Sequence, residues 1–244
     1  MKISVAGKVT EYKDISDPVF EDILRITGPN NMWTSFHSIE PLYTMYQNIR
    51  YIVEHQIPGA IVECGVWKGG MMQLAALTLQ HLGDETRELY LFDTFDGLPE
   101  PGEKDVDWDG NSAHATWVKR NQAGEKWGYG GTVTQVRTVM ESTNYPVAKL
   151  RYAEGMVEDT IPDQAPEQIA VLRLDTDFYS STLHELTHLY PVLSIGGVLI
   201  VDDYGYYRGA REATDEYFQK NKAKMLLTRV NMSVHQGVKI EHCD

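Results

Sequence analysis

Five short apolar segments of this chain each carry an acidic residue at or next to their end, and helix-like stretches separate most of them. Strands buried on both faces of a parallel sheet read as near-continuous apolar runs. Alternation of such runs with helices predicts an α/β fold with a mostly parallel sheet. The segments are 60–64, 89–93, 150–154, 169–175 and 197–202, with the acidic residues Glu63, Asp93, Glu154, Asp175 and Asp202.

Helices on both faces of this sheet are expected from the apolar spacing between the strands. The chain then ends in two β-rich runs joined by a short turn, which predicts a terminal hairpin. At 244 residues the length suits one sizeable domain, 1–244, with an N-terminal helical region over 1–57. The expected helices cover 71–79, 133–142, about 180–190 and 208–221, and the hairpin runs are 225–230 and 234–240.

The turn after the first strand carries glycines where a ligand would lie. Gly65 and Gly69 would let the backbone approach a ligand closely, and the helix that follows offers free N–H groups. The spacing is not Gly-x-Gly-x-x-Gly, and Trp67-Lys68 would crowd a dinucleotide pyrophosphate, which disfavours a dehydrogenase.

Acidic residues at the first strand ends favour a nucleoside ligand. The carboxylate of Asp93 could accept two hydrogen bonds from ribose hydroxyls. The alternative is an aspartate that caps the turn before Thr94. Taken with Glu63, a nucleoside-binding role is the better interpretation, and Glu154 and Gly155 after the third strand are further candidates for cofactor contacts.

Four aspartates after the last two parallel strands give the strongest chemical signal. They are Asp175, Asp177, Asp202 and Asp203. Neighbouring strands lie about 5 Å apart, so these carboxylates would repel one another unless a cation lay among them. Carboxylate oxygens with room for water or substrate oxygens suit Mg²⁺. The pattern therefore predicts a magnesium site; the alternative is a capped turn with one buried and three solvated aspartates.

Residues 95–131 interrupt the α/β alternation with many glycines, prolines and tryptophans. A long insertion of this kind in a compact domain is more often a lid or a binding loop than a linker. His114, within the insertion, could reach a substrate as a base, although a lone loop histidine is more often solvated.

A formal charge of −13 disfavours a nucleic-acid partner, because phosphate binding needs a basic surface. It also disfavours docking on an anionic membrane, and no apolar run approaches the roughly 20 residues that a membrane span needs. With two cysteines, Cys64 and Cys243, a reducing compartment fits best, so a cytoplasmic protein is expected. The aromatic N-terminal region hints at a homo-oligomer.

Four blocks in this order resemble the macrocin O-methyltransferase (TylF-type) family, which includes macrolide-sugar and aminocoumarin-sugar methyltransferases of antibiotic biosynthesis. The resemblance covers about residues 40–240. The blocks are Val62-Glu63-Cys64-Gly65-Val66-Trp67-Lys68-Gly69-Gly70, Asp93-Thr94-Phe95-Asp96-Gly97-Leu98-Pro99, Leu172-Arg173-Leu174-Asp175-Thr176-Asp177-Phe178-Tyr179 and Asp202-Asp203-Tyr204.

This resemblance implies a class I methyltransferase fold, a Rossmann-like seven-stranded sheet whose last strand is antiparallel. It implies S-adenosylmethionine as cofactor, held at the positions of Glu63 and Asp93, and a small-molecule acceptor, expected to be a sugar diol of a glycosylated natural product. It also implies Mg²⁺ on Asp175, Asp202 and Asp203 with Asp177 as general base. His114 stays a second candidate for the base.

Two other functions remain open from the residues alone. A phosphoester hydrolase could act through the aspartates, although it would need two metals and usually more histidine or asparagine ligands. A non-catalytic nucleoside-binding protein could share the fold, because a fold does not fix a function.

Overall fold

A seven-stranded mixed sheet forms the centre of the computed structural model, which describes residues 2–5, 8–31 and 39–241. The strand order is β5-β4-β3-β6-β7-β9-β8. The strands are β3 (Ala60–Cys64), β4 (Leu89–Asp93), β5 (Leu150–Glu154), β6 (Ile169–Leu174), β7 (Leu193–Val201), β8 (Thr228–Arg229) and β9 (His235–Val238).

The pairing confirms the expected topology. Strands β3 to β7 are parallel, whereas β9 pairs antiparallel with both β7 and β8. Every residue of β3 and β6 is buried, which is why both segments read as continuous apolar runs. The order reverses between β3 and β6, so the crevice at the carboxyl ends of these two strands is the expected ligand site.

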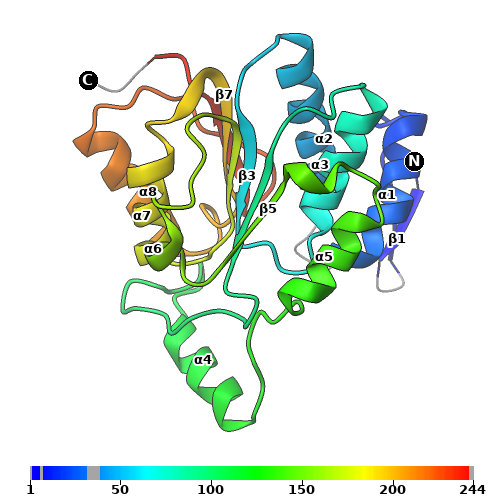
Figure 1. Cartoon of the computed structure of the whole chain (residues 1–244). Helices are drawn as coiled ribbons and strands as arrows, with labels where there is room; N and C mark the ends of the chain where they lie inside the picture. The colour runs from blue at the N-terminus through cyan, green and yellow to red at the C-terminus, as the bar shows by residue number, and fades with distance from the viewer. Residues whose placement is uncertain (1, 6–7, 32–38, 242–244) are drawn as a thin grey trace.

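Helices cover both faces of the sheet (Figure 1). Two separate apolar clusters form the core, one on each face. No helix in the described ranges is long and apolar enough to cross a membrane. Cys64 is a buried free thiol, and Cys243 lies outside the described residues. One face carries α1 (Pro18–Thr27), α2 (Glu40–Glu54), α3 (Gly70–His81) and α5 (Val133–Glu141), and the other carries α6 (Val157–Thr160), α7 (Tyr179–Leu189) and α8 (Arg208–Lys220).

The sequence predicted a helical region over 1–57, but this region is only partly helical in the structure. It begins with an antiparallel pair of strands, β1 (Lys2–Val5) and β2 (Lys8–Glu11), before α1, the 3-10 turn Gly28–Asn30 and α2. The alternation of polar and apolar residues in this segment has the period of two that favours strands. Residues 32–38 of the region lie outside the described part of the chain.

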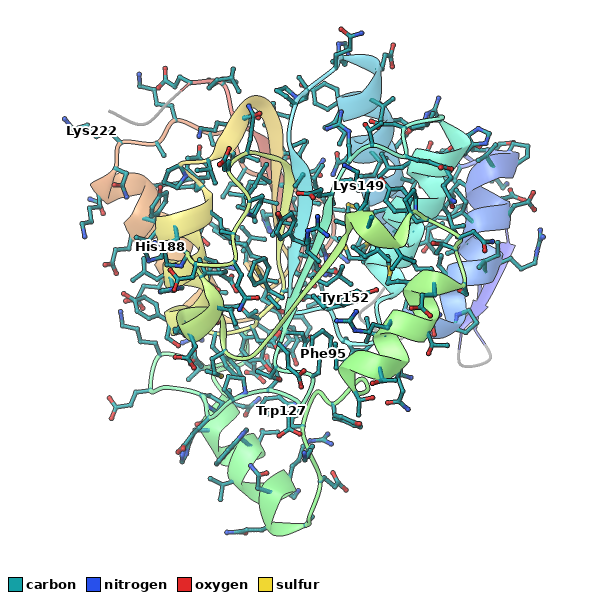
Figure 2. The ribbon with its side chains drawn as sticks, in the orientation of Figure 1. Phe95, Trp127, Lys149, Tyr152, His188 and Lys222 are labelled. Atoms are coloured by element: carbon teal, nitrogen blue, oxygen red, sulfur yellow. The ribbon has the colours of Figure 1, made fainter. Side chains whose placement is uncertain are left out.

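The insertion 95–131 contains a helix, α4 (Ala113–Gln122), that projects beyond the carboxyl ends of the strands (Figure 1). Buried Asp105 ties the insertion to the fold, because its Oδ1 accepts a hydrogen bond of 2.8 Å from the N–H of Tyr179 at the start of α7. Trp127 lies between the sheet and α4 (Figure 2), where its carbonyl accepts a hydrogen bond from the N–H of Leu98. The insertion is thus anchored above the strand ends.

Candidate active site

A buried arginine joins three strands at the centre of the site. Arg173 in β6 is level with Glu63 in the neighbouring β3, so both side chains project from the same face of the sheet. Its Nη1 donates to Glu63 Oε1 at 2.5 Å and to Asp175 Oδ2 at 2.7 Å. Its Nη2 donates to Asp202 Oδ1, just beyond β7, at 2.5 Å. One guanidinium therefore holds a carboxylate within β3 and two carboxylates that directly follow β6 and β7.

Sequence reasoning identified the carboxylates and missed Arg173. The signal was present, because an arginine inside an otherwise apolar buried strand must be paired with acidic groups. The charged partners were already candidates for the site.

A second group of carboxylates lies beside this network. One oxygen each from Asp175, Asp177 and Asp203 lies within 4.8 Å of the others. Asp203 is buried, and its Oδ2 has no hydrogen-bond partner among the described residues. Asp177 has a left-handed backbone with φ of +68°, which aspartate tolerates better than most residues. Three converging carboxylates with an unsatisfied buried oxygen fit a bound cation.

The grouping differs in one member from the expected metal set. The sequence placed Mg²⁺ on Asp175, Asp202 and Asp203, with Asp177 as the base. In the structure Asp177 belongs to the group of converging oxygens, whereas Asp202 Oδ1 accepts a hydrogen bond from Arg173. All four aspartates nevertheless line one cavity.

Burial and mutual repulsion shift the proton affinities of these groups. Burial, reinforced by repulsion from Asp175, raises the pKa of Asp177 to about 7. Burial together with the charges of Asp177 and Asp202 raises the pKa of Asp203 well above its ordinary value. Burial also raises the pKa of Glu63 to about 7, against the opposing effect of Arg173. Without a cation, the site therefore retains protons at neutral pH.

Asp93 braces the loops that follow β3 and β4 on one side of the cavity. Its Oδ2 accepts hydrogen bonds from the N–H groups of Val66 and Trp67 at 2.6 and 2.9 Å, and its Oδ1 accepts one of 2.6 Å from Phe95. Trp67 and Phe95 both have left-handed backbones, with φ of +50° and +49°. The turn-capping role considered for Asp93 is therefore present, and the residue also lines the cavity.

The glycines after β3 are needed for contacts within the protein. A Cβ on Gly65 would lie 2.0 Å from the carbonyl oxygen of Asp175, so only glycine lets the loops after β3 and β6 meet. Gly69 precedes α3 with φ of +80°, a conformation that glycine adopts without strain. Gly65 lines the cavity, and Gly69 is not among its lining residues.

The cavity has a volume of about 460 Å³ and opens at the carboxyl ends of the strands. Besides the acidic residues and the segments that directly follow β3, β5 and β6, its walls come from the N-terminal region, the insertion and the loops that follow β7 and precede β9. These residues include Asn30, Asn31, Pro41 and Leu42, then Leu98, Trp127 and Gly128, and lastly Tyr206, Tyr207, Asn231 and Ser233.

Besides Gly69, two further predicted site residues are not among the residues that line this cavity. His114 is exposed on α4, where its Nε2 lies 3.0 Å from Glu100 Oε1, and it is not a lining residue. Glu154 is exposed at the end of β5, whereas the following Gly155 lines the cavity. The helical conformation of residues 113–122 turns His114 toward Glu100.

Comparison with known proteins gives a consistent match over most of the chain. The family model of macrocin-O-methyltransferase (TylF) matches residues 35–235. Demethyldecarbamoylnovobiocin O-methyltransferase of Streptomyces niveus is 31% identical over 207 residues, which cover 84% of this chain and 76% of that protein. Mycinamicin III 3''-O-methyltransferase of Micromonospora griseorubida is 33% identical over 177 residues, covering 70% and 66%.

Solved structures agree with the topology. The O-methyltransferase NovP superposes with a TM-score of 0.74 at 28% identity, covering 89% of this chain and 88% of that one. The calicheamicin methyltransferase CalS11, at 18% identity and a TM-score of 0.63, covers 96% and 99% and supports the fold alone. The expected class I methyltransferase fold is confirmed.

Proposed function

The chain belongs to the macrocin O-methyltransferase (TylF) family of S-adenosylmethionine-dependent enzymes, and we propose that it methylates a hydroxyl of a glycosylated small molecule with Mg²⁺ in its aspartate site. One observation carries the proposal. A buried Glu63 oxygen that has no partner within the described ranges of the chain lines the same cavity as the converging carboxylates of Asp175, Asp177 and Asp203.

The cofactor side of the cavity fits S-adenosylmethionine. Its amine and ribose hydroxyls are hydrogen-bond donors, and Glu63 Oε2 is a buried acceptor without a partner among the described residues. We assign the cofactor to Glu63, Asp93 and the backbone around Gly155, all of which line the cavity. Asp93 also fixes the loops on which these contacts depend.

The aspartate side fits a hard divalent cation. Mg²⁺ prefers carboxylate oxygens and keeps positions open for water or substrate. We assign Asp175, Asp202 and Asp203, the set that the family resemblance implies, as the residues that would hold it. Asp177, whose oxygen converges with those of Asp175 and Asp203, would lie next to the ion. When bound, Mg²⁺ would polarise a hydroxyl group and lower its pKa.

Asp177 is the proposed general base. A sugar hydroxyl is a weak nucleophile until its proton is removed, and a base works best when its pKa lies near the operating pH. In the metal-free chain, burial and repulsion from Asp175 raise the pKa of Asp177 to about 7. A cation bound beside it would lower this pKa and keep the carboxylate ionised, so that it could accept a proton. The carboxylate of Asp177 would take the hydroxyl proton as the oxygen attacks the methyl carbon of the sulfonium, which leaves as a neutral thioether.

The residues that line the cavity and the names of the relatives support one class of acceptor. Trp127, Tyr206 and Tyr207 offer apolar faces beside the aspartates, and aromatic faces bury extended apolar surface well. The relatives named above methylate a novobiocin precursor and mycinamicin III, according to their names. We propose an acceptor that joins a sugar to an apolar group.

The purified chain can be tested with S-adenosylmethionine, Mg²⁺ and a panel of acceptors. Demethyldecarbamoylnovobiocin and mycinamicin III represent glycosylated compounds, and a simple catechol and a phosphate monoester serve as comparisons. Mass spectrometry should detect a product one methyl group heavier from a glycosylated compound. Methylation of the catechol alone, or release of phosphate, would contradict the proposed acceptor class.

A further inference from the structure

Arg173 has a role in the site that goes beyond neutralising a buried charge. Its guanidinium contacts Glu63 on the proposed cofactor side and both Asp175 and Asp202 on the proposed cation side. We propose that Arg173 is a positioning residue that holds the cation ligands in binding geometry before the cation arrives. The inference rests on the proposed magnesium site.

The balance of charges shows why the site needs a positively charged side chain. Of the described residues that line the cavity, Arg173 is the only arginine or lysine, whereas seven are acidic. Five of these acidic residues surround it: Glu63, Asp175, Asp177, Asp202 and Asp203. Like charges at this spacing repel and would drive the side chains apart. Arg173 contacts three of the five and leaves Asp177 and Asp203 without its hydrogen bonds.

Asp175 links the arginine network to the cation group. It accepts from Arg173 through Oδ2, and it also contributes one of the three converging oxygens. Asp202 is held at the same time through Oδ1 by the second nitrogen of the guanidinium. Two proposed ligands that follow from different strands are thus oriented by a single rigid group.

The planar guanidinium suits this task better than an ammonium group. Its nitrogens are fixed relative to one another, so three acceptors are bound with a set geometry, whereas lysine provides a flexible point charge. Arg173 also contacts side chains that are themselves largely buried, with exposed fractions of 1% for Glu63 and 11% for Asp202. The strands that carry these groups define the sheet centre, so the arrangement is rigid.

Two substitutions change this geometry while preserving every charge. Arg173→Lys keeps the positive charge of the side chain and loses the planar guanidinium. Glu63→Asp keeps the carboxylate and shortens the side chain by one methylene. The full chain, freed of metal, is titrated with MgCl₂ by calorimetry. Arg151→Lys is the matched control, since Arg151 is an exposed arginine on β5 that pairs with Glu88.

We expect Arg173→Lys to weaken Mg²⁺ binding by about 10- to 100-fold, the range found when residues that orient metal ligands are replaced. Glu63→Asp should weaken it several-fold, and Arg151→Lys should leave it unchanged. Turnover of Arg173→Lys should recover at saturating Mg²⁺, because positioning acts through affinity. A purely structural arginine would lower thermal stability without changing the Mg²⁺ affinity of the folded variant.

The outcomes separate this inference from the proposed function. Suppose that the wild-type chain binds Mg²⁺ and that both charge-preserving variants bind it with the same affinity. This result overturns the positioning role of Arg173 and leaves the proposed magnesium site intact. If Arg173→Lys does not fold, unchanged affinity in Glu63→Asp overturns it. A wild-type chain that does not bind Mg²⁺ at all contradicts the magnesium site and with it the role of Arg173.

Discussion

The carboxylate of Asp93 accepts a hydrogen bond of 2.6 Å from the backbone N–H of Val66, joining the loops that follow β4 and β3. The same carboxylate accepts hydrogen bonds from the N–H groups of Trp67, in the loop after β3, and Phe95, in the loop after β4. One side chain therefore fixes two loops that line the cavity and holds two residues in left-handed conformations.

Asp93→Asn should loosen both loops, because the amide group places a donor where backbone N–H groups need an acceptor. Hydrogen bonds to a charged group contribute about 1.5–3 kcal/mol each, so the free energy of unfolding should fall by at least about 2 kcal/mol. Chemical denaturation measures this loss, and calorimetry should show weaker binding of S-adenosylhomocysteine. Asp163→Asn, at an exposed aspartate, should match the wild type; equal stability of Asp93→Asn would refute the bracing role.

Asp177 and Asp202 are assigned different tasks, and their asparagine variants should separate them. Asp177→Asn should lower kcat by about 10²–10⁴, the range for loss of a general base, with Mg²⁺ affinity within about threefold of wild type. Asp202→Asn should weaken Mg²⁺ binding at least about tenfold. The converse pattern, with Mg²⁺ binding lost in Asp177→Asn and kept in Asp202→Asn, would make Asp177 the ligand.

The metal-free protein should become less stable as the pH rises from about 4 to about 7. Burial raises the pKa of Asp177 to about 7, so the folded state binds this proton more tightly than the unfolded state, whose pKa is about 3.9. The stabilisation that this proton provides is fully present below the pKa of the unfolded state. It is lost as the pH rises through the pKa of the folded state.

Asp177→Asn should remove this dependence. Relative to the variant, the wild type should lose more than about 1 kcal/mol over that pH range, since one pKa unit corresponds to about 1.4 kcal/mol, and the difference should level off above pH 7. Denaturation in EDTA at a series of pH values gives the result. Parallel curves for the two proteins would be inconsistent with a raised pKa at Asp177.

His114→Ala should leave turnover nearly unchanged. The imidazole is exposed on α4 and lies against Glu100, away from the cavity. Exposed ion pairs of this kind contribute about 0–1 kcal/mol to stability, so both kcat and thermal stability should stay close to wild type. Steady-state kinetics beside Asp177→Asn decides between the two candidate bases. A loss of two or more orders of magnitude in His114→Ala would instead assign the base to His114.

The strand ends could be predicted from the sequence because burial on both faces imposes continuous apolar runs, and polar residues then mark where those runs stop. The terminal hairpin was predicted from two β-rich runs joined by a short turn, and the antiparallel strand was implied by the family resemblance. The same reasoning gathered Asp175, Asp177, Asp202 and Asp203 in one place, and they line one cavity.

Side-chain direction is the part that the pattern could not supply. Arg173 was passed over because it lies within an apolar strand, and the three acceptors that explain it follow from three different strands. The bracing bonds of Asp93 come from N–H groups 26 and 27 residues earlier in the chain. His114 points away from the cavity because α4 forms within the insertion. The strands β1 and β2 lie in a region for which the sequence predicted helices.

The metal dependence of methyl transfer tests the proposed site most directly. The purified chain, S-adenosylmethionine and a glycosylated acceptor from the panel are combined with excess EDTA, and then with Mg²⁺ in excess over the chelator. Methylated product should be nearly absent in EDTA and should appear on addition of Mg²⁺, with Asp203→Asn inactive in both conditions. Full turnover of the wild-type chain in excess EDTA would contradict the assignment of the aspartates to a cation.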